Sequence, residues 1–235
     1  PDGGGILVVL PTGAGKTDVA VEWALGWLER DDRRRLLWLA HRQELLNQAA
    51  LRFRQLAACR PPSFRRTGRV IHSEAFPVSV LADPEQHLAL ATWQSMVAGT
   101  AEKRKRAQLD SFLSRPTIVV VDEAHRAGAP RYVKLLDHIN ADPDTVALVG
   151  LTATPVPLSD EAAARVAKRF PRRVGGATRE RLIAEEILAR PTVNEVRTGL
   201  RVELTPEELR VAARGKDVPA SVLNRLGAAD RNRQV

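Results

Sequence analysis

The chain has 235 residues, 44% of them hydrophobic and 27% charged, which is enough to bury a core and excludes a disordered tail or a coiled coil. One cysteine, Cys59, and five scattered histidines exclude an internal disulfide and a zinc site, and the lack of a signal peptide or an apolar run of about 18 residues predicts a soluble, cytoplasmic protein. The net charge of +8 favours a polyanionic partner such as nucleic acid, although the excess of arginine over lysine is equally consistent with genomic base composition.

Short apolar segments alternate with amphipathic segments of helical period as far as Phe170. The apolar segments predict strands at residues 6–10, 36–40, 88–91, 118–121 and 146–151. The amphipathic segments predict helices at residues 18–30, 42–58, 131–140 and 159–170. Because the strands are apolar throughout, the pattern indicates an α/β fold with a mostly parallel sheet that is covered by helices on both faces.

The other segments are less regular. Residues 59–86 contain four prolines and only a weak strand candidate at residues 70–72. Residues 172–176 indicate a break in regular structure, after which a helix is predicted at residues 178–188. Thr205 and Glu208 have the spacing of a capping box and predict the start of a short helix.

The segment between the first predicted strand and the first predicted helix has the pattern of a phosphate-binding loop. Its glycines allow a tight turn whose N–H groups point at phosphate oxygens, and the following helix directs its positive end to the same place. Lys16 would reach the β- and γ-phosphates, and the Thr17 hydroxyl would bind Mg²⁺. The strict motif has a glycine where this chain has Leu10, so an ordinary glycine-rich turn is the alternative. The predicted nucleotide-binding residues are Pro11, Thr12, Gly13, Ala14, Gly15, Lys16 and Thr17.

Two adjacent carboxylates follow the strand predicted at residues 118–121. The carboxyl ends of parallel strands form the ligand crevice of such a sheet, so Asp122 and Glu123 are expected beside the phosphate loop. Asp122 would hold Mg²⁺ through a water molecule, and Glu123 would orient and deprotonate the attacking water. A solvated acidic turn that caps the next helix is the alternative. Thr152 and Thr154 add two hydroxyls at the end of the last predicted strand.

These three motifs, in this order, resemble those of the superfamily 2 helicases and translocases of the DEAD/DEAH-box type. Residues 11–17 match the family's phosphate loop, which requires no glycine at the position of Leu10. Residues 122–125 match its Asp-Glu-Ala-His motif, and residues 151–155 are similar to its third motif. Two weaker matches to further family motifs lie at residues 39–45 and 91–95.

The resemblance implies a three-layer RecA-like P-loop NTPase domain that uses ATP and Mg²⁺. The catalytic residues it implies are Lys16, Asp122, Glu123 and His125. By the same resemblance, the nucleic-acid backbone would be gripped by Arg42, Gln43 and Thr92. His125 would act with Thr152 and Thr154 to couple that grip to the nucleotide site. The most similar branch contains RadD-like, XPB-like and type III restriction subunits, which favours DNA over RNA.

The family builds its ATPase site between two RecA-like domains, and the second supplies arginine fingers from a Gln-x-x-Gly-Arg-x-x-Arg motif. That motif is absent from this sequence. We therefore expect residues 1–190 to form the first RecA-like domain and residues 191–235 to form a connector toward a missing second domain. Without the arginine fingers, this piece should hydrolyse ATP weakly.

The leading hypothesis is the ATP-binding motor domain of a nucleic-acid-dependent helicase or translocase. A module that only binds nucleotide and nucleic acid, with catalysis supplied by a partner domain, is the alternative. A phosphate-loop kinase of small metabolites would share Lys16 but gives no reason for the motifs at two further strand ends. The basic stretches at residues 102–106 and 165–173 could contact nucleic acid or form solvated helix faces, and Trp23 and Trp27 are expected to pack in the core.

Overall fold

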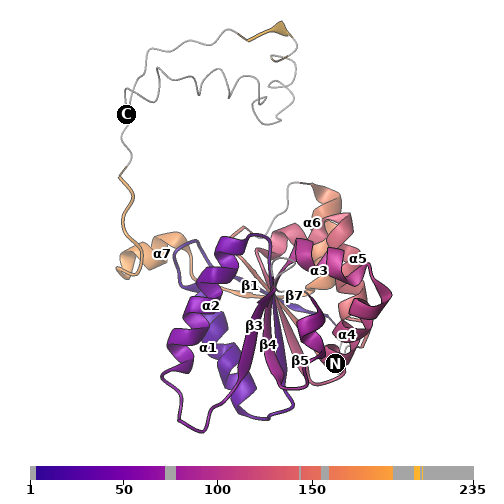
Figure 1. The fold of residues 1–235 in the computed structure, drawn as a ribbon. Coiled ribbons are helices and arrows are strands. Elements are labelled where there is room, and N and C mark those ends of the chain that lie inside the picture. Colours follow the sequence, from indigo (N-terminus) through magenta and orange to yellow (C-terminus); the bar gives the residue numbers. More distant parts are fainter. Residues whose placement is uncertain are drawn as a thin grey trace, which may run out of the picture. The chain divides into compact units, whose positions relative to one another are not determined.

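The computed structural model describes residues 4–71, 78–142, 144–154, 159–192, 204–206 and 208. The chain forms two compact units, residues 1–189 and residues 190–235. The first unit is built on a seven-stranded sheet in which every paired strand is parallel (Figure 1). The predicted α/β class is therefore confirmed.

The strands follow the order β3-β4-β2-β5-β6-β1-β7 across the sheet. All five predicted strands are present, with ends that shift by one or two residues. The weak candidate at residues 70–72 overlaps β3, which begins earlier than predicted, and its last residue lies outside the described residues. The bounds are β1 Ile6–Val9, β2 Arg35–Ala40, β3 Thr67–Ile71, β4 Gln86–Thr92, β5 Thr117–Asp122, β6 Val146–Thr152 and β7 Arg172–Gly175.

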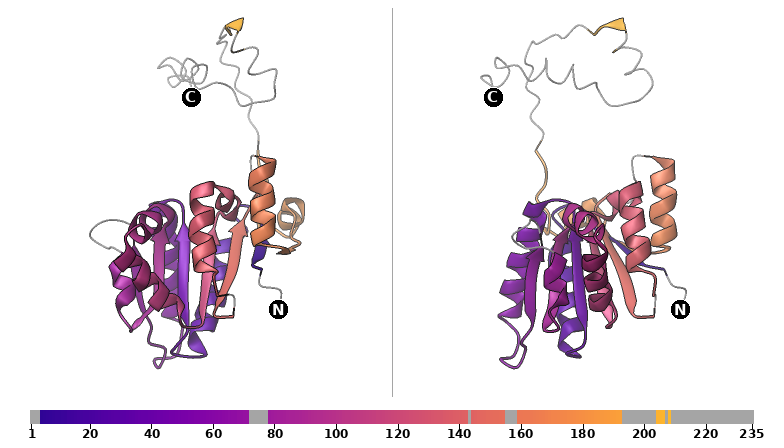
Figure 2. Two further views of the ribbon diagram at one scale, coloured as in Figure 1. Left: turned by 90° about the vertical axis from the view of Figure 1, so that its right-hand side faces the viewer. Right: turned by 45° about the vertical axis from the view of Figure 1, so that its right-hand side comes forward.

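Helices cover both faces of the sheet, with α1 and α2 on one face and α3 to α6 on the other (Figures 1 and 2). Alternate residues of β2 show the two layers, because Leu36 and Trp38 pack with α1 and α2 while Leu37 and Leu39 pack with the opposite helices. The bounds are α1 Lys16–Glu29, α2 Gln43–Ala57, α3 Trp93–Thr100, α4 Lys103–Leu113, α5 Pro130–Ile139, α6 Asp160–Arg169 and α7 Arg179–Ala184, with 3₁₀ helices η1 Val78–Ala82 and η2 Ala124–Gly128.

Two elements near the end of the first unit correct the sequence prediction. Residues 172–175 are the edge strand β7 instead of a break, because their backbone pairs with β1 although all four residues are exposed and the segment is not apolar. The helix predicted at residues 178–188 ends at Ala184. It ends there because Glu186 adopts a left-handed φ of 58°, and the N–H groups of Glu186 and Ile187 donate back to the carbonyls of Ile183 and Leu182.

In the second unit, the predicted capping box is confirmed. The Thr205 N–H donates to the Glu208 carboxylate over 3.0 Å, and the Glu208 N–H donates to the Thr205 hydroxyl over 3.3 Å. Across the described ranges, we find no helix with both the length and the apolar character required to cross a membrane.

Candidate nucleotide-binding site

The carboxyl ends of five strands form one rim of the sheet, and the sequence motifs all lie on it. Parallel pairing aligns Asp122 of β5 with Leu151 of β6, and Val9 of β1 with Thr152 of β6. The phosphate loop, the acidic pair and the threonine motif therefore follow adjacent strands. On the other side of β5, Ala40 of β2 is in register with Thr92 of β4, so the two weaker motifs continue the same row.

The predicted phosphate loop connects β1 to α1. Gly13 and Gly15 have φ values of 83° and 78°, a left-handed conformation that glycine adopts without strain. Gly15 is the N-cap of α1 and supplies no capping side chain, so the first-turn amides of the helix have no side-chain acceptor there. The loop is fixed to the sheet by the Leu10 N–H, which donates to the Thr152 carbonyl over 3.1 Å. These are the features of an anion-binding turn.

The remaining predicted nucleotide-binding residues lie in the same turn and at the start of α1. Pro11 and Ala14 form the turn, since the Ala14 N–H donates to the Pro11 carbonyl over 3.1 Å. Thr12 is exposed, and Lys16 and Thr17 are half-buried in the first turn of α1. Residues 11–17 are therefore brought together in one short turn.

The acidic pair lies where β5 leaves the sheet. Asp122 is the last residue of β5 and is only 7% exposed. Burial raises the pKa of Asp122 to about 6, repulsion from Glu123 adds to the rise, and the Glu123 N–H and the Lys16 ammonium oppose it. Glu123 itself has a left-handed φ of 52°, which is strained for a side chain other than glycine. Its N–H donates to Asp122 Oδ1 over 3.0 Å.

A divalent cation fits this arrangement, because it would compensate the buried Asp122 carboxylate. Within the described residues, no group of three or more histidine, cysteine, aspartate or glutamate side chains could hold a metal. A cation held by Thr17 and Asp122 would need further oxygen ligands, as Mg²⁺ commonly takes from phosphates and water.

His125 connects the acidic motif to the threonine motif. Its Nδ1 lies 3.1 Å from Thr152 Oγ1, 3.3 Å from Thr154 Oγ1 and 3.3 Å from Glu123 Oε2. The Thr152 hydroxyl also donates to the Thr154 carbonyl and accepts from the Thr154 N–H. Burial lowers the pKa of His125, Arg126 lowers it further, and Glu123 opposes both. The structure thus brings Glu123, His125, Thr152 and Thr154 into one polar network.

The three residues expected at the nucleic acid lie further along the rim. Arg42 is the exposed N-cap of α2, and Gln43 is the first residue of that helix. Thr92 is 8% exposed and caps α3, with its oxygen accepting from the Ser95 N–H over 3.1 Å. Thr92 therefore holds the start of α3 in place.

Three neighbours of these residues were missed by sequence reasoning. Gln94 Nε2 donates to the His41 carbonyl over 3.3 Å, which links α3 to the end of β2. His41 and Arg126 line a cavity of about 390 Å³ together with Arg42 and Glu123. Gln94 and His41 lie inside the quoted motifs, so their position was available from the sequence, whereas nothing in the sequence identified Arg126.

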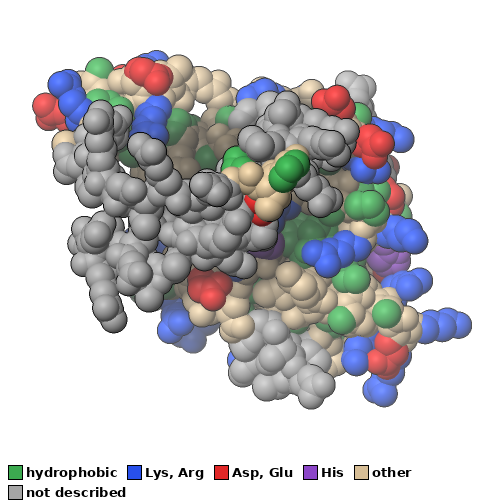
Figure 3. Space-filling view, turned by 90° about the horizontal axis from the view of Figure 1, so that it is seen from above, with side chains coloured by type: hydrophobic (Ala, Val, Ile, Leu, Met, Phe, Trp, Pro, Cys, Tyr) green, Lys and Arg blue, Asp and Glu red, His purple; other side chains and the backbone are tan. Residues whose placement is uncertain are grey.

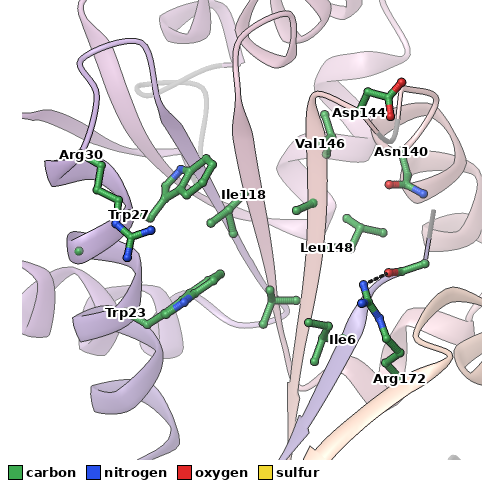
Figure 4. Close-up of a pocket in the computed structure, with 14 residues that line it drawn as sticks. Ile6, Trp23, Trp27, Arg30, Ile118, Asn140, Asp144, Val146, Leu148 and Arg172 are labelled. Carbon is green, nitrogen blue, oxygen red and sulfur yellow. Dashed lines mark hydrogen bonds between the residues drawn. The ribbon is translucent and has the colours of Figure 1, made fainter. Parts of the chain in front are cut away.

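A larger hollow of about 570 Å³ lies at the opposite, amino ends of the strands (Figure 4). Trp23 and Trp27 of α1 face the sheet there, across from Ile6 and Ile118 (Figure 4). Trp23 is 48% exposed, so the prediction of core packing is wrong for Trp23, whereas Trp27 is half-buried and packs against the core. The sheet face beside α1 is only partly covered, and the stripe made by the two tryptophans lines this hollow instead. The hollow is mainly apolar, although Arg30, Asp144 and Arg172 also line it, and it holds none of the predicted site residues.

Comparison with known proteins agrees with the fold. The family model described as "Type III restriction enzyme, res subunit" matches residues 2–157. The ATP-dependent DNA helicase MPH1 of Candida albicans is 29% identical over 155 residues, which cover 64% of this chain and 12% of the relative. The corresponding helicase of Aspergillus oryzae is 28% identical over 159 residues, which cover 64% of this chain and 13% of the relative. The chain thus spans about an eighth of these relatives.

Solved structures share the fold. The helicase domain of Pyrococcus furiosus Hef has a TM-score of 0.54 and 25% identity, with coverage of 73% of this chain and 35% of that one. The DUF1998 helicase MrfA bound to DNA has a TM-score of 0.57 and 17% identity over 73% of this chain and 23% of that one. The expected RecA-like fold of a superfamily 2 helicase domain is confirmed.

Proposed function

This chain belongs to the family of type III restriction enzyme res subunits, and from that membership we propose that it is the ATP-binding motor domain of a nucleic-acid-dependent helicase or translocase. The observation that carries the proposal is the row of motifs on one rim, where residues 11–17, Asp122, Glu123 and Thr152 follow three adjacent strands. This arrangement supports an ATPase site of the Asp-Glu-Ala-His type.

Nucleotide binding would rest on the turn between β1 and α1. Its N–H groups would bind phosphate oxygens, and the Lys16 ammonium would hold the β- and γ-phosphates. Bound Mg²⁺, held by Thr17 and Asp122, would neutralise charge that develops on the phosphates. The raised pKa of Asp122 supports this role, because a buried carboxylate beside another carboxylate gains from a nearby cation.

Hydrolysis would need a base, and we assign that role to Glu123. Its carboxylate would accept a proton from the attacking water. The left-handed backbone at Glu123 turns the chain away from β5, so two successive carboxylates can serve one site. His125 would position Glu123, since its Nδ1 lies within 3.3 Å of both Glu123 Oε2 and the hydroxyls of Thr152 and Thr154.

Nucleic acid would contact the other end of the same rim. Arg42 and Gln43 at the start of α2 are accessible there, and Thr92 would fix the start of α3 beside them. The hydrogen bond from Gln94 to the His41 carbonyl joins α3 to the end of β2. A ligand that binds at the start of α2 or α3 would therefore contact two connected elements. DNA is the expected partner, because the curated relatives are named ATP-dependent DNA helicases.

A second RecA-like domain would complete the ATPase site, with residues 1–190 as the first motor domain and residues 191–235 as the connector. Arginine fingers in related phosphoryl-transfer enzymes contribute about 10³ to 10⁵ in rate, so we expect slow turnover by this chain. A module that binds nucleotide and nucleic acid without hydrolysis is the second candidate, and the lack of the finger motif favours it for the isolated piece.

Steady-state ATP hydrolysis by this chain, with and without single-stranded DNA, separates the two candidates. The motor-domain proposal predicts slow hydrolysis that DNA stimulates. Binding of ATP and DNA without any turnover would favour the binding module. Failure to bind ATP would contradict both.

A further inference from the structure

A basic groove lies between α4 and α5, away from the nucleotide site. It has a volume of about 580 Å³, and its apolar floor includes Val97 and Leu135. Four basic side chains line it, and no acidic residue does so. The basic residues are Arg106, Arg131, Lys134 and His138.

The charge of the groove is largely uncompensated. His138 is bonded to the Asp110 carboxylate over 2.6 Å, and the Arg106 side chain donates to the Thr100 carbonyl over 3.0 Å. Arg131 and Lys134 are exposed, and no ion pair to either is found among the described residues. Lys and Arg side chains gather on this side of the molecule (right in Figure 3). The groove thus attracts a polyanion.

The stretch at residues 165–173 is richer in basic residues but is more neutralised. Arg165 pairs with Glu161, and Arg169 pairs with Asp137. Arg172 donates to the Gly4 carbonyl over 3.3 Å. Two of its arginines are therefore paired with carboxylates, whereas among the described residues only His138 of the groove has a carboxylate partner, so the groove is the better site for an external anion.

A stack of side chains holds the groove in place relative to the rim. Trp93 directly follows Thr92, the cap of α3 at the rim, and its ring stacks on Tyr132 with a centroid distance of 4.5 Å. The guanidinium of Arg131 lies 4.7 Å from the same Tyr132 ring. Trp93 and Tyr132 are both buried. Arg131 is thus positioned by the element that also forms the rim.

The length of α3 gives the separation between the rim and the groove. The helix begins at the rim with the cap Thr92, and Thr100 at its other end lines the groove. Eight helical residues rise about 12 Å, which corresponds to about three or four nucleotides along one strand of B-form DNA. A strand that crosses the rim can therefore continue into the groove.

We propose that the groove formed by Arg106, Arg131, Lys134 and His138 is a second contact site for the phosphate backbone of DNA that crosses the rim. The proposal rests on the proposed function, because it requires nucleic acid at the rim. Arg131 and Lys134 lie three residues apart on α5 and would each bind a phosphate. The floor made by Val97 and Leu135 would face the sugars.

The test is the salt dependence of DNA binding by this chain, measured by fluorescence anisotropy with labelled single-stranded DNA of about 16 nucleotides. Removing two phosphate contacts in Arg131→Ala/Lys134→Ala should reduce the magnitude of the slope of log K against log salt by about 1.4, since each contact with single-stranded DNA contributes about 0.7. Between about 50 mM and 200 mM salt, the loss of affinity should then be about sevenfold smaller for the variant than for the parent.

Two control variants distinguish the loss of phosphate contacts in the groove from a general effect of lower net charge. Arg65→Ala/Arg69→Ala removes two exposed arginines at or beside the edge strand β3 and should leave the slope unchanged. Arg131→Lys/Lys134→Arg keeps both charges and should retain the parent slope. Both substituted α5 positions are exposed, so the fold should survive, and circular dichroism checks this.

The rim variant Arg42→Ala distinguishes failure of this inference from failure of the proposed function. Suppose that the salt dependence of DNA binding is weaker in Arg42→Ala but parental in Arg131→Ala/Lys134→Ala. That result would overturn the proposed contact in the groove and would leave the proposed contact at the rim standing. A groove that instead takes an acidic peptide would give this same result. Equal losses in the groove and β3 variants would also overturn the inference, and no binding by the parent would overturn both.

Discussion

The two ends of the same strands carry opposite features. At their carboxyl ends, β1, β5 and β6 lead into left-handed residues, a buried carboxylate and a polar network around His125. At their amino ends, the same strands line an apolar hollow with Ile6, Ile118 and Val146 (Figure 4). The difference teaches that, of the two ends of these strands, it is the carboxyl end that combines left-handed residues with a buried carboxylate, which ligand binding would compensate.

The largest effect is expected from the base at the carboxyl end. Glu123→Gln removes the group that would accept the proton, so hydrolysis should fall by about 10² to 10⁴ while ATP binding is retained. Single-turnover hydrolysis with the protein in excess measures this slow reaction. Glu44→Gln is the matched control, since Glu44 lines the same cavity of about 390 Å³. Equal rates for the two variants would remove Glu123 from the mechanism.

The buried carboxylate gives the next effect, and it is an effect on stability. The pKa of Asp122 rises from 3.8 to about 6 on folding, so its ionisation lowers the free energy of unfolding by up to about 3 kcal/mol as the pH rises through that window. In Asp122→Asn the side chain does not ionise, so the free energy of unfolding does not fall in this way, and the amide oxygen can still accept from the Glu123 N–H. The variant should therefore be more stable than the parent at pH 7 and should lose that advantage near pH 4.

Chemical denaturation of the parent and Asp122→Asn at both pH values measures the difference. The sign of the change with pH is the test, because ionisation of most carboxyl groups in folded proteins raises the free energy of unfolding as the pH rises. A stability difference that is independent of pH between 4 and 7 would contradict the raised pKa.

A smaller effect is expected at the phosphate loop. Gly15 has a φ of 78°, and a Cβ there would meet no atom within 4 Å. Gly15→Ala should therefore introduce backbone strain alone, about 1 to 2 kcal/mol of lost stability. Thermal unfolding of the ligand-free protein measures it, and an unchanged midpoint would argue against the left-handed turn.

The smallest effect, with the opposite sign, is expected at the amino-end hollow. Gly26 lies within α1 and lines the hollow, and a Cβ there would also meet no atom within 4 Å. Because its backbone is helical, Gly26→Ala should stabilise the protein by about 0.5 to 1 kcal/mol. The same unfolding experiment compares both glycines, and destabilisation by Gly26→Ala would contradict the comparison of the two ends.

The sequence allowed much of this fold to be predicted, for reasons that particular residues make clear. Strands buried on both faces, such as β5, read as continuous apolar runs, and the motif at residues 11–17 lies between a strand and a helix as its chemistry requires. The edge strand β7 was missed because its residues, including Arg172 and Arg173, are exposed and show no apolar pattern. Its pairing with β1 is made by the backbone, which leaves no signal in the sequence.

Side-chain contacts were harder to predict than strand ends. The Gln94 bond to the His41 carbonyl and the stack of Trp93 on Tyr132 join residues that are far apart in the sequence, and no local pattern reports such pairs. Trp23 and Trp27 had the spacing of a buried stripe, yet that stripe lines a hollow because the sheet face beside α1 is only partly covered. Periodicity indicates which face of a helix turns inward but not how fully that face is covered.

The most direct test of the central claim is equilibrium binding of Mg·ATP to the parent, to Lys16→Ala and to Arg30→Ala, which removes one positive charge at the amino-end hollow. The rim model predicts that Lys16→Ala loses charged hydrogen bonds worth about 1.5 to 3 kcal/mol and binds about 10- to 100-fold more weakly, while Arg30→Ala binds like the parent. Undiminished affinity in Lys16→Ala, or a loss confined to Arg30→Ala, would contradict the placement of the nucleotide at the carboxyl ends of the strands.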